Sequence, residues 1–219
     1  MSFDKQKAEA SKKNLKNADL QYVDLQKADL SEGILIEACL KNCNLSEADL
    51  CEADISGANL ENARLHRTVL YRCRGKEINF SNAILTQANL VEANLSGANF
   101  THANLMESNI EGANLINTCF KDANLCEVNL TGIFLVNANL SGADLTNAEC
   151  IAADFSGCDF SEANLSNTYI NHADLSGANL KSALNLTRDQ VETAFINKET
   201  LLPDSIPIIW VSKTEYEFE

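Results

Sequence analysis

The sequence predicts an all-β solenoid, because its apolar residues recur every five positions over most of the 219-residue chain. From Leu15 to Leu180 there are 34 such positions; 24 are Leu, five are Phe and three are Ile. Ala stands two residues earlier at 21 of them, and Asn or Asp stands between at 24. A helix would need a period near 3.6 and a long strand a period of two. Such short units cannot bury an apolar face alone, so they must coil and stack.

Each five-residue unit combines a strand of three residues with a turn. Seven of the nine glycines lie two positions after the central Leu, Phe or Ile. Several other units place Asn there, including Asn62, Asn82 and Asn117. A type II turn needs a positive φ at its third residue, where Gly and Asn are favoured. The outward Asn and Asp residues are expected to bond neighbouring backbone.

A second period of 20 residues predicts a four-sided coil. Phe80, Phe100, Phe120 and Phe160 lie 20 or 40 residues apart, and Leu140 fills the gap. If four units make one coil, these side chains stack in one column. The 34 units then give about 8.5 coils, or a rod of roughly 40 Å at ~4.8 Å per coil.

The unit, as in "ANLVEANLSGANFTHANL", resembles the pentapeptide-repeat family over residues 13–184. The resemblance implies a right-handed quadrilateral β-helix. It says little about function, because the motif describes the core rather than a site. The best-understood members are fluoroquinolone-resistance proteins, which are acidic dimeric rods that resemble duplex DNA and bind DNA gyrase. Other members, many of them cyanobacterial, are regulatory or scaffolding partners of proteins. Residues 183–204 resemble the C-terminal cap common in cyanobacterial members.

Both ends of a β-solenoid need covers, because they expose unpaired backbone groups and apolar core. We therefore expect three parts: an N-terminal helical cap at 1–12, the repeats at 13–184 and a C-terminal cap at 185–219. The first helix is expected to run from Phe3 to about Lys12, with Ser2 as its N-cap.

The C-terminal cap is expected to open with a second helix. Thr187 and Gln190 form a capping-box pattern, and the helix should extend to about Asn197. Three of its residues are expected to face the last coil: Val191, Ala194 and Phe195.

The apolar run "IPIIWV" at 206–211 has two interpretations. It folds back over the end of the rod, or it forms a dimer interface, since gyrase-binding relatives pair through their C-terminal ends. The residues concerned are Ile206, Ile208, Ile209 and Trp210. The hydrophilic tail from Ser212 to Glu219 is expected to be frayed.

The net charge of −14 argues against a general affinity for nucleic acid or anionic membrane. It leaves open a basic partner, or a surface that competes with nucleic acid by resembling it. The absence of an apolar run of signal-peptide or membrane-span length favours a cytosolic location. The eight cysteines show no CxxC pair and no metal-ligand spacing, so we interpret them as packing residues.

The sequence shows no pattern typical of a catalytic or metal-binding site. His66, His102 and His172 lie on different coils and cannot share a metal. The abundant carboxylates form no recognisable acid–base pair, and neither a phosphate loop nor a nucleophile elbow is present. We therefore expect no catalytic residue, metal or cofactor, and a protein that is not an enzyme.

Residues 64–78 are the exception to an acidic chain, since they hold four of the five arginines. The period is intact at Leu65, Leu70 and Phe80, so the segment should form one coil. Gly75 replaces a core Leu, and we expect a small loop to bulge there. The basic residues are Arg64, Arg67, Arg72, Arg74 and Lys76.

Exposed apolar residues gather on two adjacent faces when the sequence is folded onto a 20-residue coil. One face carries Ile34, Ile36, Ile116, Phe134 and Val136, and the next carries Val69, Tyr71, Val91, Ile151 and Tyr169. Such clusters mark contacts with proteins. The alternative is that they are tolerated β-formers on a stiff scaffold.

Two functions follow from these surfaces. The first is a non-catalytic, regulatory or adaptor module that binds one or more proteins through Arg64, Arg67, Val69, Tyr71, Arg72, Arg74, Lys76, Phe134 and Tyr169. Its alternative reading is that the arginines only pair with acids on adjacent coils, such as Glu47, Glu52 and Asp54. The second function is DNA mimicry against DNA gyrase by residues 77–184, whose net charge is −10. Direct binding to nucleic acid or membrane is not expected, and a homodimer through the C-terminal end stays open.

Overall fold

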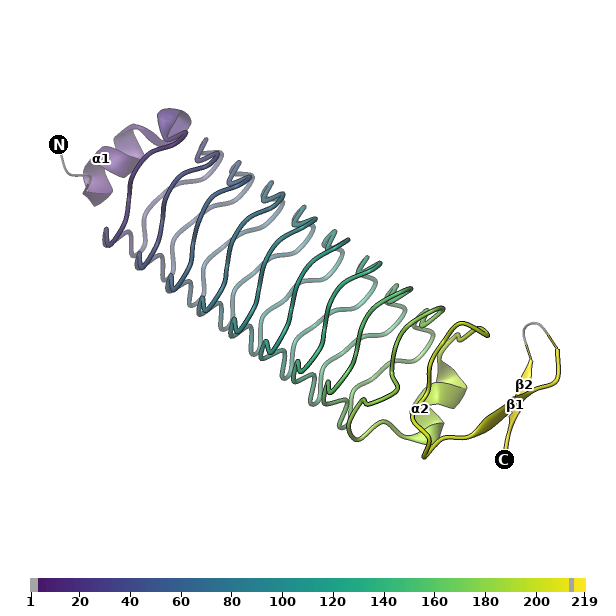
Figure 1. Cartoon of the computed structure of the whole chain (residues 1–219). Coiled ribbons are helices and arrows are strands. Elements are labelled where there is room, and N and C mark those ends of the chain that lie inside the picture. Colours follow the sequence, from purple (N-terminus) through teal and green to yellow (C-terminus); the bar gives the residue numbers. More distant parts are fainter. Residues whose placement is uncertain (1–3, 213–214) are drawn as a thin grey trace.

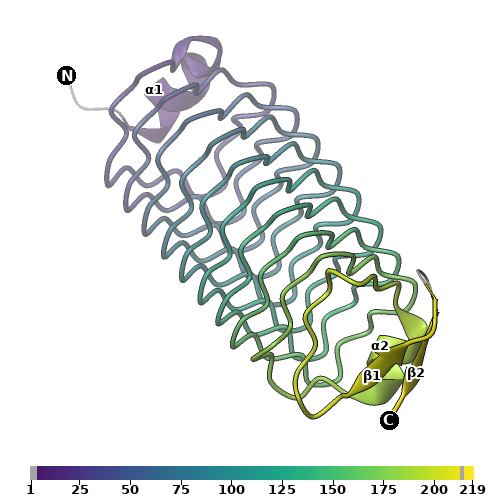
Figure 2. The ribbon, with the colours of Figure 1, turned by 45° about the vertical axis from the view of Figure 1, so that its right-hand side comes forward.

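The chain forms a four-sided rod in the computed structural model, which describes residues 4–212 and 215–219 (Figure 1). Parallel bridges join each outward strand residue to the one 20 positions later, from Asp19 with Cys39 to Asn164 with Leu184. Four pentapeptides therefore make one coil, and the predicted right-handed quadrilateral β-helix is confirmed. Figure 2 shows the coils stacked on a common axis.

Each side of the rod is a column of outward residues spaced by 20. We name the columns face 1 (Ile34 to Asp174), face 2 (Asp19 to Asn179), face 3 (Asp24 to Leu184) and face 4 (Asp29 to Tyr169). The chain runs through the faces in this numerical order, so face 4 leads back to face 1.

The corners have the predicted turn geometry. Every fifth residue from Asn17 to Gly177 has a φ between 50° and 70°. A backbone hydrogen bond closes almost every corner, as from the Ala18 N–H to the Leu15 carbonyl at 3.0 Å. Many of these residues are Glu, for which the left-handed conformation costs about 1 kcal/mol. The regular ladder between coils must offset that cost.

The outward Asn and Asp residues hold the turns and the stack together. The Asn79 Oδ1 accepts a hydrogen bond from the Ser81 N–H at 3.0 Å. It also accepts one from Asn99 Nδ2, one coil later, at 3.2 Å. These side chains are therefore structural, as expected from their place in the repeat.

The core is a continuous column of buried side chains. Phe80, Phe100 and Phe120 stack with ring centroids 5.0 and 4.7 Å apart, in the column predicted from their spacing. Phe160 instead meets Phe155 edge-on at 5.2 Å. All eight cysteines are free thiols, and buried Cys43 donates to the Leu20 carbonyl of the preceding coil.

Helix α1 (Lys5–Ala10) covers the N-terminal end, and the short 3-10 helix η1 (Lys12–Asn14) leads into the first coil. Asp4 is the N-cap, because its side chain accepts a hydrogen bond from the Lys7 N–H at 2.9 Å. The expectation that Ser2 caps the helix is therefore wrong, and Ser2 and Phe3 lie outside the described residues. Ala8 is fully buried against the core.

Helix α2 (Arg188–Thr193) opens with the predicted capping box between Thr187 and Gln190. It ends earlier than expected, and Phe195 is 59 % exposed rather than packed on the last coil. The reason is that residues 194–196 resume the repeat, with Phe195 in the outward position. Its N–H donates to the Ala173 carbonyl at 2.8 Å. Helix α2 thus takes the place of one pentapeptide on face 4.

The chain ends in a hairpin of strands β1 (Ile208–Trp210) and β2 (Tyr216–Phe218), beside α2 at the C-terminal end (Figure 1). The expected frayed tail is therefore wrong for residues 216–218. The Tyr216 hydroxyl donates to the Val191 carbonyl at 3.3 Å. The Arg188 guanidinium carbon lies 4.0 Å from the Phe218 ring centroid. These contacts tie the hairpin to α2.

Candidate partner-binding surface

The basic segment forms a regular coil, and the bulge expected at Gly75 is wrong. The Gly75 N–H donates to the Asn94 carbonyl at 2.8 Å, as a central Leu does elsewhere. A Cβ added at Gly75 would lie 2.8 Å from Leu95 Cδ2 and 3.5 Å from Ile78 Cγ2. These two side chains fill the space that a central Leu would occupy. We refer to residues 64–76 as the basic coil.

Two arginines of the basic coil reach forward along corner columns to the next coil. Arg67 Nε donates to Gln87 Oε1 at 2.7 Å. Arg72 Nε lies 2.6 Å from Glu92 Oε2 in an ion pair. Both bonds run along the axis of the rod and join residues 20 positions apart.

Arg74 reaches backward instead. Its Nε lies 3.2 Å from Asp54 Oδ2, which is one of the partners expected for a purely structural role. Glu47 is paired with Lys27 at 3.4 Å rather than with an arginine. The columns therefore balance part of the basic charge within the rod.

Tyr71 adds an aromatic surface to the basic coil. The Arg72 guanidinium carbon lies 4.8 Å from its ring centroid. The hydrogen bond to Glu92 raises the pKa of Arg72, so its charge is fixed at any physiological pH. Burial raises the pKa of Asp54, but hydrogen bonds from Ser56 and Arg74 outweigh it and hold that pKa below its ordinary value. Half-buried Val69 lies on face 4, two residues before Tyr71.

Arg64 and Lys76 are the least engaged cations of the basic coil. Arg64 is exposed on face 3, next to Ile84, and has no ion pair or side-chain hydrogen bond within the part of the chain that the structure describes. Among the described residues, Lys76 pairs only with the adjacent Glu77, at 3.4 Å, and 64 % of its side chain is exposed.

The structure does not bring Phe134 and Tyr169 to the basic coil. Phe134 is 53 % exposed on face 1, three coils beyond Arg74, or roughly 14 Å. Tyr169 is 55 % exposed on face 4, five coils beyond Val69, or roughly 24 Å. The predicted residues therefore form three separate places on the rod rather than one patch.

The apolar run near the C-terminus divides by burial. Ile206 is buried, and Ile208 and Trp210 are half-buried on one side of β1. Ile209 is 54 % exposed on the other side. The first three fit the end-cover interpretation, and Ile209 is the residue left for a contact with another molecule.

Sequence reasoning missed that all four faces end in an exposed apolar residue. Each is the last outward residue of its column and is more than half exposed: Tyr169, Leu184, Phe195 and Leu201. The signal was in the sequence, since residues 194–196 and 200–202 repeat the small–outward–apolar triplet. The two triplets are hard to recognise because the spacing between bridged residues changes here from 20 to 21, for Asp174 and Phe195, and to 22, for Asn179 and Leu201.

The described residues contain no group of three or more His, Cys, Asp or Glu side chains that could hold a metal ion. Among the helices described, none has the length and apolarity to cross a membrane.

The sequence matches the family model "Pentapeptide repeats" in eight copies, over residues 6–35, 35–67, 76–112, 107–132, 123–161 and 158–188. The matches leave out 68–75, inside the basic coil. Comparison with curated protein sequences finds no significant match.

Several solved structures are similar. HetL from Nostoc sp. strain PCC 7120, a pentapeptide repeat protein involved in heterocyst differentiation regulation, is 29 % identical, with 89 % of each chain covered and a TM-score of 0.47. A trypsin-treated QnrB1, a plasmid-mediated fluoroquinolone resistance protein, is 19 % identical, with 80 % of this chain and 84 % of that chain covered and a TM-score of 0.52. The likeness to QnrB1 concerns the fold alone. With its repeats matched by the family model and its coils of four pentapeptides, this chain belongs to the pentapeptide-repeat family.

Proposed function

We propose that this chain is a non-catalytic protein-interaction module whose partner contacts the basic coil. The observation that carries the proposal is the cluster of Tyr71, Arg72 and Arg74 at the corner between faces 4 and 1. More than half of each arginine side chain stays exposed, 51 % for Arg72 and 60 % for Arg74. Guanidinium groups beside an aromatic ring suit bidentate recognition of carboxylates and are typical of interface hot spots.

Stability alone is a weak reason for these cations. Exposed ion pairs contribute about 0–1 kcal/mol each. The repeat needs no cation at these positions. Asn or Asp fills most places equivalent to Arg64 and Arg74 in other coils, and Glu, Asn or Gly fills most places equivalent to Arg67 and Arg72. A role in recognition therefore accounts better for four arginines in one coil.

The charge around the basic coil indicates which charges the partner's surface should carry. Residues 77–184 carry a net charge of −10, so an acidic surface would be repelled along most of the rod and attracted at the basic coil. The partner should thus present carboxylates at one place and neutral or basic residues beside it. We place the interaction in a reducing compartment, where eight cysteines remain free thiols.

The test is a pull-down of partners by three baits in parallel. The first bait is wild type, and the second replaces Arg64, Arg67, Arg72 and Arg74 by Ser. The third is a matched control with the same change in charge, in which four lysines elsewhere become Ser: Lys12, Lys13, Lys27 and Lys41. We expect a partner that wild type and the control retain and the arginine variant loses. Equal retention by all three baits would show that the basic coil is not the site.

A second candidate function depends on the acidic part of the rod, residues 77–184. A surface with net charge −10 over residues 77–184 could occupy a DNA-binding groove of a type II topoisomerase, as the family's resistance proteins do with gyrase. The basic coil borders this surface and interrupts the negative charge along the rod, which is why we place this function second. It requires inhibition of gyrase supercoiling at micromolar protein, and an unaffected supercoiling rate would exclude it.

A further inference from the structure

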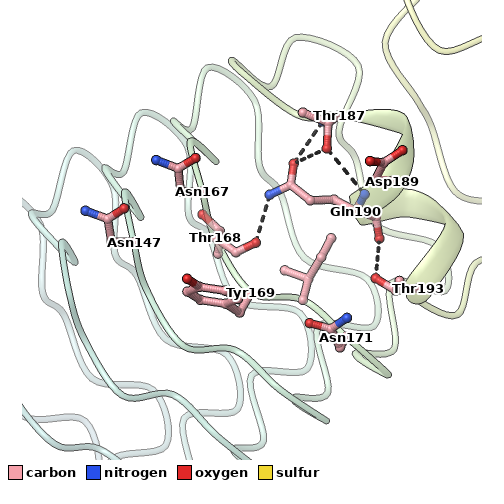
Figure 3. A pocket seen from close by; sticks show the side chains of 10 residues that line it. Asn147, Asn167, Thr168, Tyr169, Asn171, Thr187, Asp189, Gln190 and Thr193 are labelled. Atoms are coloured by element: carbon pink, nitrogen blue, oxygen red, sulfur yellow. Dashed lines mark hydrogen bonds between the residues drawn. The ribbon is translucent and has the colours of Figure 1, made fainter.

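A pocket lies between face 4 of the last coils and helix α2 (Figure 3). Its volume is about 480 Å³, within the range of roughly 300–1,000 Å³ that is usual for ligand sites. It arises because α2 takes the place of a pentapeptide that would have continued face 4. Thr168 and Ile170, each 3 % exposed, belong to its lining.

The pocket is held in shape by Gln190. Its Nε2 donates to the Leu165 carbonyl at 3.0 Å and to the Thr168 carbonyl at 2.8 Å. Its Oε1 accepts from the Thr187 N–H at 2.8 Å, which completes the capping box. These bonds fix the start of α2 on the last coils, so the pocket exists before any ligand arrives.

Several polar side chains in the pocket have no hydrogen-bond partner among the residues that the structure describes. The dashed contacts in Figure 3 join only Thr168, Thr187, Gln190 and Thr193. The described part of the chain offers no hydrogen bond to five other lining side chains: Asn147, Asn167, Tyr169, Asn171 and Asp189. The lining therefore holds amide and carboxylate oxygens whose acceptors are unused within the described chain, together with the exposed ring of Tyr169.

The negative charge in and around the pocket favours a positively charged ligand. Asp189 is the one charged residue in the lining, and Glu149 is the exposed neighbour of Tyr169 on face 4. The nearby Arg188 is already engaged, with Nε 3.0 Å from Glu192 Oε1 and its guanidinium over Phe218. An aromatic face attracts a cation, and a carboxylate strengthens the hydrogen bonds of a charged donor.

We propose that this pocket receives an arginine side chain of a protein partner, stacked on Tyr169 and bonded to Asp189. Arginine fits better than lysine, because its planar group stacks on aromatic rings and offers five donors to the unused acceptors. The proposal rests on the proposed function, in that the chain acts by binding a protein. It adds a second contact about 24 Å from the basic coil along face 4. The partner would then present carboxylates to one place and an arginine to the other.

The first experiment uses a small probe and needs no partner. N-acetyl-arginine methylamide is titrated into ¹⁵N-labelled full-length protein to about 20 mM, which detects Kd values of order 10 mM. The citrulline analogue has nearly the same shape without the charge and is titrated in parallel. We expect shifts of the Asn167 and Asn171 side-chain amides with arginine and at least about threefold weaker binding of citrulline. Equal binding of both compounds, or no shift with arginine, overturns the proposal.

Variants assign the binding to the pocket. Tyr169→Ala and Asp189→Asn should each weaken arginine binding by about threefold, and together by about tenfold. Tyr22→Ala is the matched control, because Tyr22 is 76 % exposed at the other end of the rod. The variants should keep the circular dichroism spectrum of wild type. Unchanged binding by the double variant would place the arginine elsewhere and contradict the proposal.

The same variants separate this proposal from the proposed function. A partner lost by the arginine variant of the basic coil and weakened at least threefold by the double pocket variant agrees with both. A partner that the double pocket variant holds with unchanged affinity leaves the basic coil as the site and excludes the pocket as a partner contact. Arginine binding to the pocket, with no partner sensitive to the basic coil, supports the pocket alone.

Discussion

Gly75 allows a direct test of how the basic coil is packed. Restoring the leucine of the repeat, Gly75→Leu, should destabilise the protein rather than improve it. A Cβ alone would lie 2.8 Å from Leu95 Cδ2 and 3.4 Å from Ile55 Cγ1. Ile78, fully buried, adds a third neighbour at 3.5 Å. The neighbouring side chains already occupy the space for the missing leucine.

The expected magnitudes come from overpacking and cavity costs. Gly75→Leu should lower the free energy of unfolding by about 3 kcal/mol, at the upper end for overpacking. Ile78→Ala should lower it by about 3 kcal/mol, because it leaves a cavity. The double variant restores the ordinary Leu and Ala of the repeat at nearly conserved volume, so it should lose only about 1.5 kcal/mol. The two changes are therefore coupled by more than 3 kcal/mol.

Urea denaturation, followed by circular dichroism, measures all four proteins of the cycle. The m-value must stay constant for the midpoints to be compared as stabilities. Each single variant should also melt about 6–12 °C below wild type, from 2–4 °C per kcal/mol for a chain of this size. Ala98→Ile, in the same position one coil later but beside Leu95, is the control and should lose about 2 kcal/mol. Additivity of the two changes within about 0.5 kcal/mol would refute the packing argument.

Three further predictions concern the ends and the thiols. The hydrogen bond from Lys12 lowers the pKa of Asp29 from 3.8 to about 2, so its stabilising effect is present above pH 4 and is lost as pH falls towards 2. The melting temperature of Asp29→Asn should therefore lie below wild type at pH 7, and the gap should close between pH 4 and pH 2; a constant gap contradicts this. Phe218→Ala removes the ring under Arg188 and should shift the emission of Trp210 to the red, whereas an unchanged spectrum would mean that the hairpin does not depend on this contact. In a thiol titration of the native protein only the four half-buried cysteines should react, because the fold closes the other four off from the reagent until the protein unfolds: Cys43, Cys73, Cys150 and Cys158. Burial also raises the pKa of these four thiols.

The fold could be predicted because every unit of the repeat contains the residues that its strand and turn require. The central Leu, the small residue before it and the corner at positive φ recur at fixed spacing. The number of units per coil followed from the spacing of Phe80, Phe100, Phe120 and Phe160 by 20 or 40 residues. The ends were harder, because a residue there has no repeat to define its direction. Phe195 looked like part of a helix face, but the ladder with Asp174 places it in an outward position.

The candidate site was predictable in position but not in detail. The sequence placed Arg72 and Arg74 on or beside the two faces with exposed apolar residues, since the period fixes which face each residue occupies. It could not give the direction in which a long side chain reaches. Arg72 reaches forward to Glu92, whereas Arg74 reaches back to Asp54. The pocket could not be predicted from the sequence either, because its size depends on the distance between α2 and the last coils.

The basic coil is well suited to a functional test, because its ion pairs join side chains of neighbouring coils and do not involve the backbone. Removing the arginines breaks two exposed ion pairs and one hydrogen bond to Gln87, which together contribute at most about 3 kcal/mol. The backbone ladder of the coil is untouched, because its bonds come from main-chain atoms such as the Gly75 N–H. The four-fold Ser variant should therefore keep the fold, with a melting temperature lower by no more than about 12 °C. A partner lost by such a variant is lost through the surface and not through unfolding.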